Sequence, residues 1–265
     1  MTKIVTIVQA RCGSSRLPGK ILMPVLGQTT LYRMIERLEK SKLKGTIVIA
    51  TTDASEDDII VNACENAGWE YYCGHEHDLL DRHYQVASKY NADIIIKIPS
   101  DCPLIDHRIV DKVIRYFLDH KLDYVSNLHP PTYPDGNDVE IMTITALEKA
   151  WMEANAAFER EHTTPYIWEN PSLFSIGNVT WEKGLDYAMS HRLTLDYGED
   201  YNCIKAIFEA LYPYDCDFSL DQILKLLENR IDIFEMNKKY AGVNWYRHHL
   251  DELKTIESSQ TKILM

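Results

Sequence analysis

Short apolar runs separated by amphipathic stretches dominate the first half of the chain. The runs fall at 4–8, 46–51, 69–73, 93–98 and 124–125, and we interpret each as a β-strand. The run at 93–98 is almost continuously apolar, which indicates a strand buried on both faces of a sheet. Because helical patterns alternate with these runs, the sequence predicts an α/β fold with a mostly parallel sheet flanked by helices.

Two helices are predicted from apolar residues at three- and four-residue spacing. The recurring positions are Leu31, Met34, Ile35 and Leu38 in the first helix, and Ile109, Val110, Val113, Ile114 and Phe117 in the second. Asp106 stands just before the second helix and is a candidate N-cap. Residues 198–229 are also expected to be helical, with Ser219 and Asp221 starting the last strong helix.

Turn-forming residues follow the last of these strands, where 130–137 reads Pro-Pro-Thr-Tyr-Pro-Asp-Gly-Asn. We predict that this turn opens an excursion from the sheet over about 128–185, with a helix near 146–155 and a strand near 174–179. The polar tail, 247–265, is expected to fray or to pack on a partner.

The turn after the first strand, residues 11–20, is the most informative segment. Gly13 and Gly19 lack a Cβ, so backbone N–H groups in this turn can approach phosphate oxygens closely. The turn also carries three cations: Arg11, Arg16 and Lys20. It is not a Walker A loop, because Ile21 stands where Ser or Thr would hold magnesium. It also lacks the third glycine of a dinucleotide fingerprint, so a different polyphosphate site is predicted.

Composition narrows the class of protein further. The 265 residues carry a formal net charge of −12, which argues against a nucleic-acid or anionic-membrane surface. The six cysteines form no Cys-x-x-Cys pair, so we expect reduced thiols rather than a zinc site or a disulfide framework. No apolar run is long enough for a membrane span. We therefore expect a cytoplasmic protein with one domain over 1–246, followed by the tail.

The loop sequence resembles a known family signature. Ala10-Arg11-x-Gly13-Ser14-x-Arg16-Leu17-Pro18-Gly19-Lys20-x-Leu22 is similar to the motif of the cytidylyltransferases that activate sugars and related acids, including the 3-deoxy-manno-octulosonate and acylneuraminate enzymes. Later motifs resemble more closely the spore-coat-polysaccharide branch, among them Asp78-Leu79-Leu80-Asp81-Arg82, Ser100-Asp101-Cys102-Pro103-Leu104-Ile105-Asp106 and Arg192-Leu193-Thr194-Leu195-Asp196. The resemblance spans roughly residues 3 to 212.

This resemblance implies a single nucleotidyltransferase domain of GT-A or Rossmann-like fold, in which the excursion covers the acceptor and helps to form a homodimer. It implies transfer of CMP from CTP to a small-molecule acceptor, with release of pyrophosphate, in surface-polysaccharide synthesis. The implied catalytic residues are Arg11, Lys20, Asp101 and Asp196. Asp101 and Asp196 are also the implied Mg²⁺ ligands, although an acid in either position could instead cap the following helix.

Two sets of binding residues follow. The candidate nucleotide-binding residues are Ala10, Arg11, Gly13, Ser14, Arg16, Lys20, Thr51, Thr52, Arg82 and Ser100. The candidate acceptor-binding residues are Tyr133, Asp138, Glu140, Arg160, Glu161, His162 and Arg192. Because arginine is suited to bidentate capture of carboxylate or phosphate, Arg160 or Arg192 would indicate an anionic acceptor.

Two alternatives remain open at this stage. A nucleotide-sugar glycosyltransferase could share such a sheet, but that chemistry usually shows an Asp-x-Asp motif, which Asp101-Cys102-Pro103 lacks. A non-catalytic nucleotide-binding domain would require a disabled site. The candidate catalytic residues are all present, so the sequence does not indicate inactivity.

Overall fold

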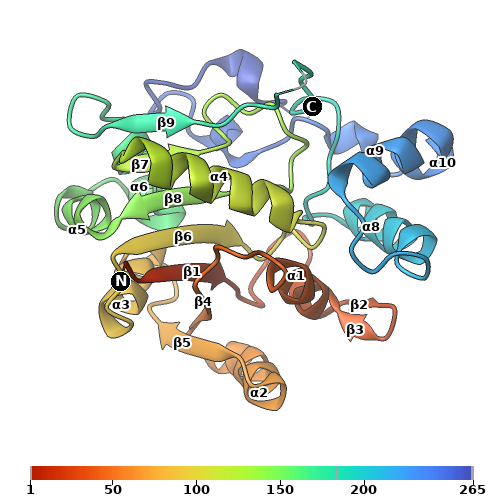
Figure 1. Ribbon diagram of the computed structural model, residues 1–265, viewed down its shortest axis with the longest axis horizontal. Helices are drawn as coiled ribbons and strands as arrows, with labels where there is room; N and C mark the ends of the chain where they lie inside the picture. The colour runs from red at the N-terminus through yellow and green to blue at the C-terminus, as the bar shows by residue number, and fades with distance from the viewer. Residues whose placement is uncertain (1, 183, 264–265) are drawn as a thin grey trace.

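The computed structural model describes residues 2–182 and 184–263. A seven-stranded sheet forms its centre, in the order β5-β4-β1-β6-β8-β7-β9 (Figure 1). The strands are β1 Ile4–Gln9, β4 Thr46–Thr52, β5 Glu70–Gly74, β6 Ile94–Pro99, β7 Tyr124–Ser126, β8 Glu140–Thr143 and β9 Ile176–Asn178, with a separate small hairpin of β2 Pro24–Val25 and β3 Gln28–Thr29. The helices are α1 Thr30–Leu38, α2 Asp58–Ala67, α3 Leu79–Lys89, α4 His107–His120, α5 Ile144–Glu153, α6 Ala157–His162, α7 Pro165–Trp168, α8 Gly198–Leu211, α9 Leu220–Asn229 and α10 Ile231–Phe234.

The sheet is mostly parallel, as predicted. Strands β5, β4, β1 and β6 run in parallel, and β9 is parallel to β7. Only β8 is antiparallel to its two neighbours, β6 and β7. The four parallel strands therefore present their carboxyl ends at one edge of the sheet, which is where ligands gather in open α/β sheets.

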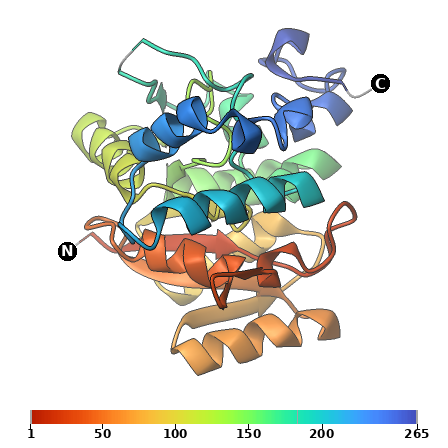
Figure 2. The same cartoon turned by 90° about the vertical axis from the view of Figure 1, so that its right-hand side faces the viewer.

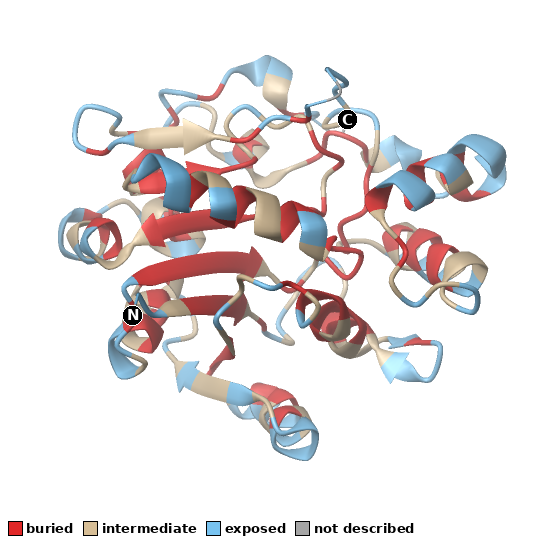
Figure 3. Cartoon of the chain, in the orientation of Figure 1, coloured by how far each residue is buried: buried red, intermediate tan, exposed pale blue. Residues whose placement is uncertain are grey.

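Helices cover both faces of the sheet, and each face has its own apolar core. Ile94, Ile96 and Ile98 of β6 pack in the core that also includes α1, α4, α8 and α9. Ile95, between them, packs in the opposite core with α3, α5 and α7. The alternation confirms that this strand is buried on both faces, and Figure 3 shows β6 almost entirely in the colour of buried residues.

Helix starts follow the capping residues in the sequence. The Asp106 side chain accepts from the backbone N–H of Arg108 at 2.9 Å, which confirms the predicted cap of α4. The Ser219 hydroxyl likewise caps α9 by accepting from Gln222. The predicted helical stretch 198–229 contains α8 and α9, the second of which starts after Ser219 as predicted, and residues 212–219 form the turn between them. Figure 2 shows α8 lying alongside α1, to which Tyr212 is hydrogen-bonded.

The segment 128–185 is not simply an excursion, which corrects the prediction. It contributes two strands to the main sheet, β8 and β9, as well as α5, α6 and α7. β8 spans only four residues, so its pattern was too short to be recognised. Its Ile141 and Met142 nevertheless pack into opposite cores.

The polar tail was predicted to fray or to pack on a partner, and the structure shows that part of it packs on its own chain. The backbone N–H groups of Lys254 and Thr255 donate to the Glu169 carboxylate at 2.6 and 2.9 Å. Leu253 and Ile256 are buried in the core beside α7. The tail therefore packs on its own chain, and the expected boundary at residue 246 falls inside the short helix η4 Trp245–His248.

We also searched the described helices for a membrane-spanning segment, and none of them combines the length and the apolar character that a bilayer requires.

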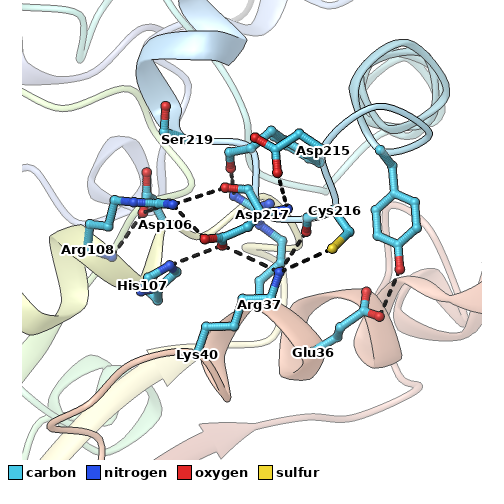
Figure 4. A network of polar contacts seen from close by, with 12 residues as sticks. Glu36, Arg37, Lys40, Asp106, His107, Arg108, Asp215, Cys216, Asp217 and Ser219 are labelled. Atoms are coloured by element: carbon cyan, nitrogen blue, oxygen red, sulfur yellow. Dashed lines mark hydrogen bonds and ion pairs between the residues drawn. The ribbon is translucent and has the colours of Figure 1, made fainter.

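A buried arginine joins α1 to two distant loops. The Arg37 Nε donates to the carbonyl of Ile105 at 2.9 Å, and its Nη2 donates to the carbonyl of Phe218 at 2.9 Å. Asp106 caps α4 with one oxygen and accepts from the Leu220 N–H with the other, at 2.8 Å. Figure 4 shows further contacts between the same parts of the chain, where His107 and Arg108 at the start of α4 contact Asp217, which precedes α9. The loop after β6, which carries Asp101, is thus held in place by its contacts with α1 and with the start of α9.

We expect Arg37→Met to lower the free energy of unfolding by about 3 kcal/mol, because buried carbonyls lose their donor. The matched control is Arg115→Met, since Arg115 is exposed on α4 and its replacement should change stability by less than about 0.5 kcal/mol. Urea unfolding followed by circular dichroism measures both. Equal losses in the two variants would contradict the role of Arg37.

Candidate active site

A cavity of about 480 Å³ opens at the carboxyl ends of β1 and β6. Its wall is built from seven stretches of chain: residues within 9–20, 76–82, 97–101, 128–140, 161–168, 194–196 and 243–249. The turn after β1, in which the sequence predicts a polyphosphate site, forms part of this wall at the edge of the parallel strands. We therefore compare the residues that line this cavity with the site residues predicted from the sequence.

The turn after β1 forms one end of the cavity. Its shape is fixed by hydrogen bonds from the N–H groups of Ser14 and Gly19 to the carbonyl of Cys12, at 2.8 and 3.0 Å. Gly19 has a φ of 68°, a left-handed conformation that glycine adopts without strain. Five of the predicted nucleotide-binding residues in this turn line the cavity: Ala10, Arg11, Ser14, Arg16 and Lys20. Gly13 does not line it.

Thr52 supports this turn from outside the cavity. Its hydroxyl donates to the buried Asp57 at 2.5 Å, and the other oxygen of Asp57 accepts from the N–H of Cys12 at 2.7 Å. Thr51 is also fully buried and away from the cavity wall. The structure therefore does not place Thr51 or Thr52 where they could contact a base, because both side chains lie within the packed end of β4.

Lys20 brings the two candidate metal ligands together. Its Nζ lies 3.1 Å from Asp101 Oδ2 and 2.9 Å from Asp196 Oδ1. Arg16 adds a further contact to Asp196 Oδ1 at 2.7 Å. Burial alone would raise the pKa of Asp196, but Lys20 and Arg16 hold it well below its usual range. Burial would likewise lower the pKa of Lys20, and the two carboxylates raise it instead.

Arg192 contacts this cluster from inside the protein, on the side away from the cavity. Its side chain is fully buried, with Nη2 donating to Asp196 Oδ2, Nε to Asp200 and Nη1 to Asp135, each at 3.0 Å. Asp200 in turn accepts from the backbone N–H of Asp196 at 3.0 Å. Arg192 was predicted to bind the acceptor, but the structure does not bring it to the cavity wall. Its donors are already used in orienting carboxylates.

The donors at this end fit a magnesium ion that is bound together with a polyphosphate. Asp101 and Asp196 are close enough to share the one ammonium group of Lys20. Magnesium at polyphosphates usually takes only one or two protein carboxylates, and phosphate and water supply the other ligands. Within 2–182 and 184–263, no group of three or more His, Cys, Asp or Glu could hold a metal ion. The donor set therefore suits a shared site and not a cage made by protein alone.

Arg82 lies at a second part of the cavity, on α3. Arg82 is only 3% exposed, and the Nε and Nη1 atoms of its side chain have no hydrogen-bond partner among the described residues. Burial, with the neighbouring charge of Arg11, lowers the pKa of Arg82 to about 10. Ser100 and Gln9 line the same part, and the buried Oε1 of Gln9 also has no partner among the described residues. Since unpaired buried polar groups are costly, this arrangement favours a polar ligand.

The remaining candidates for acceptor binding divide into two groups. Four line the cavity: Asp138, Glu140, Glu161 and His162. Burial, with the charge of Asp101, raises the pKa of Asp138 to about 7, so this carboxyl can exchange a proton near neutral pH. Burial also lowers the pKa of His162 to about 3, which keeps its imidazole neutral.

Tyr133 and Arg160 are not brought to the cavity wall. The Tyr133 ring stacks on Trp181 with centroids 5.2 Å apart. Arg160 forms an ion pair with Asp78 at 2.6 Å and donates to the carbonyl of Trp151 at the end of α5. The structure thus gives both side chains packing partners elsewhere, and neither is available to an acceptor in this cavity.

Lys97 is a cavity residue that the sequence interpretation missed. It forms a buried ion pair with Glu140, whose other oxygen accepts from Tyr124 and Thr164 at 2.5 Å each. Burial would raise the pKa of Glu140, but Lys97 and these donors lower it. A single lysine inside the apolar run of β6 was the available signal, because an unpaired charge is rarely buried in a strand.

A family comparison decides the class of protein. The sequence model described as Cytidylyltransferase matches residues 5–240. The chain belongs to the cytidylyltransferase family. This confirms the resemblance seen in the loop after β1, and the family matches the observed nucleotidyltransferase fold.

Individual relatives agree with the family assignment. The spore coat polysaccharide biosynthesis protein SpsF of Bacillus subtilis is 32% identical over 242 residues, or 88% of this chain and 97% of that protein. A solved cytidylyltransferase from Leptospira borgpetersenii has 33% identity and a TM-score of 0.84, covering 89% of this chain and 98% of that one. A CMP:2-keto-3-deoxy-manno-octonic acid synthetase complexed with CTP has 17% identity and a TM-score of 0.60, covering 79% and 99%. The last likeness shows the fold alone.

Helix α3, which carries Arg82, also carries the buried His83. From the pKa of this histidine we predict how the stability of the protein depends on pH. Burial lowers the pKa of His83 from 6.5 to about 3, so the folded state holds it neutral. The unfolded state then binds more protons below pH 6.5, and stability falls as the pH drops towards 3. We expect His83→Gln to reduce this slope by about 1.4 kcal/mol per pH unit.

Urea unfolding between pH 4.5 and 6, roughly, measures the slope. The matched control is His77→Gln, because His77 is exposed. An identical change of slope in both variants would show that the burial of His83 is not the cause.

Proposed function

We propose that the protein transfers CMP from CTP to a small-molecule acceptor, with magnesium and with release of pyrophosphate. The observation that carries this proposal is the charge cluster of Arg16, Lys20, Asp101 and Asp196 at one end of the cavity. A role in surface-polysaccharide or glycoconjugate synthesis is supported by the name of the Bacillus subtilis relative. That the protein works as a homodimer stays a prediction.

The proposed reaction is in-line attack of an acceptor oxygen on the α-phosphorus of CTP, which breaks the bond to the bridging oxygen of the pyrophosphate. Lys20 and Arg16 would turn from the carboxylates to the leaving pyrophosphate, whose negative charge increases in the transition state. Arg11 and the backbone of Ser14 would hold the phosphates in position. Asp101 and Asp196 would hold Mg²⁺, which neutralises phosphate charge when bound.

Arg82 would select the base. Its unpaired Nε and Nη1 are donors, and cytosine offers acceptors at O2 and N3. Uracil carries a hydrogen at N3, so it would leave one of these donors unpaired. The unpaired Oε1 of Gln9 could accept from the N4 amino group of cytosine, and Ser100 lines the same part of the cavity.

Thermal unfolding with CTP, UTP, ATP and GTP, each with and without Mg²⁺, tests the nucleotide half of the proposal. A ligand at about 100 times its Kd adds about 2.7 kcal/mol to the native state, which corresponds to roughly 5 °C for a chain of this size. We expect the largest shift for CTP with Mg²⁺. An equal response to UTP would contradict the role of Arg82, and no response to any nucleotide would favour a domain without nucleotidyltransferase activity.

Asp101→Asn tests the catalytic half. We expect kcat for pyrophosphate release to fall by about 100- to 1,000-fold, because the neutral amide of Asn would hold Mg²⁺ less well than the carboxylate does, and Mg²⁺ is the ion that would neutralise transition-state charge. The matched control is Asp119→Asn, since Asp119 is exposed at the end of α4 and should tolerate the change. Unaltered turnover in Asp101→Asn, with the fold intact, would remove Asp101 from the mechanism.

A further inference from the structure

The cavity has one wall that the family match does not include. The match ends at residue 240, whereas seven consecutive residues, 243–249, line the cavity. These residues form η4 and the turns on either side of it. They therefore lie outside the matched region, whereas the other walls of the site lie within it.

This wall is held firmly in place. The carbonyl of Val243 accepts from the buried Arg192 at 2.8 Å, and the Asn244 side chain caps η4 and donates to the carbonyl of Gln260 at 2.9 Å. Tyr246 is only 6% exposed and packs in the core beside α7. The wall is thus pre-organised before any ligand binds.

The wall adjoins the part of the cavity that remains for the acceptor. The ring of Trp245 stacks on His162 of α6, with centroids 3.8 Å apart and planes at 17°. The ring of Trp168 of α7 lies beside that of Trp245, with centroids 6.3 Å apart. The turn after β1 provides the end for phosphates, and Arg82 with Gln9 provides the part for the base. The surfaces that are left are the stretch 128–140, which carries the carboxyl groups of Asp138 and Glu140, and the surface built by α6, α7 and 243–249.

A count of positive charges then points to one residue. Six Lys and Arg side chains line the cavity: Arg11, Arg16, Lys20, Arg82, Lys97 and Arg247. Arg16, Lys20 and Lys97 form ion pairs with carboxylates. Arg11, Arg82 and Arg247 have no carboxylate partner among the described residues, and the first two belong to the phosphate and base parts. Within the described part of the chain, the one hydrogen bond that Arg247 donates runs from its Nε to the neighbouring His248, at 3.1 Å.

We propose that Arg247 binds an oxyanion of the acceptor, a carboxylate or a phosphate, and that 243–249 is the wall that selects the acceptor. This inference rests on the proposed CTP-dependent function. It replaces the expectation that Arg160 or Arg192 would bind the anion, since both are used in structural ion pairs. Arginine suits this role because its planar guanidinium can donate two parallel hydrogen bonds to either group.

The test uses simple anions, so it does not require the acceptor to be known. The full-length protein is saturated with CTP and Mg²⁺, which fills the end of the cavity that binds phosphates. It is then titrated calorimetrically with inorganic phosphate and, separately, with pyruvate. We expect at least one anion to bind, and the tighter of the two indicates whether the acceptor group is a phosphate or a carboxylate.

Arg247→Ala should weaken that binding at least tenfold, in keeping with the loss of charge-assisted hydrogen bonds. Its affinity for CTP should stay within about twofold of the wild type. The matched control is Arg230→Ala, because Arg230 is exposed, pairs with the neighbouring Asp232 and lies away from the cavity. It should bind the anion as the wild type does.

Three results would overturn the inference: neither anion binds the CTP-loaded wild type, Arg247→Ala binds the anion unchanged, or Arg247→Ala loses CTP instead. The proposed function fails separately, at the first step, if the wild type does not bind CTP. In that case this inference falls with it.

Discussion

The rest of the site depends on one largely buried carboxylate, Asp196, whose side chain is 14% exposed, and on the three cations around it. Arg16 and Lys20 come from the turn after β1, while Arg192 approaches from within the protein. A buried carboxylate without partners is strongly destabilising, so residues some 176 to 180 positions apart must stay together. The same cluster places Asp101 beside Lys20 and, through the contact of Arg192 with Val243, fixes the start of the wall at 243–249.

These ion pairs also explain how a rigid scaffold can offer a reactive end. Lys20 and Arg16 lie at the cavity with their charge balanced by carboxylates, and a polyphosphate supplies the alternative negative charge. Arg192 cannot exchange its carboxylate partners for a polyphosphate in this way, because its side chain is fully buried between Asp135, Asp196 and Asp200. The cluster therefore has a fixed inner half that sets geometry and an outer half that can turn to a ligand.

Much of the fold could be predicted from the sequence, because the information is local. The apolar runs of β1, β4 and β6, the cap Asp106 and the turn after β1 all depend on neighbouring residues. Partners of long polar side chains depend on distant packing, which periodicity does not report. For that reason Tyr133, Arg160 and Arg192 were expected at the acceptor, whereas each has structural partners elsewhere. For the same reason Lys97 and the wall at 243–249 were missed, because their places in the cavity depend on contacts with distant parts of the chain.

The most direct test of the central claim is a crystal structure of the protein with CTP and Mg²⁺. The account predicts that the triphosphate lies along the turn after β1, with Lys20 Nζ and Arg16 now donating to phosphate oxygens. It also predicts that Asp101 contacts the metal and that Arg192 keeps its contact with Asp196. The account would be contradicted if the nucleotide bound elsewhere, or if it bound in the cavity while Lys20 kept both of its carboxylate partners and touched no phosphate.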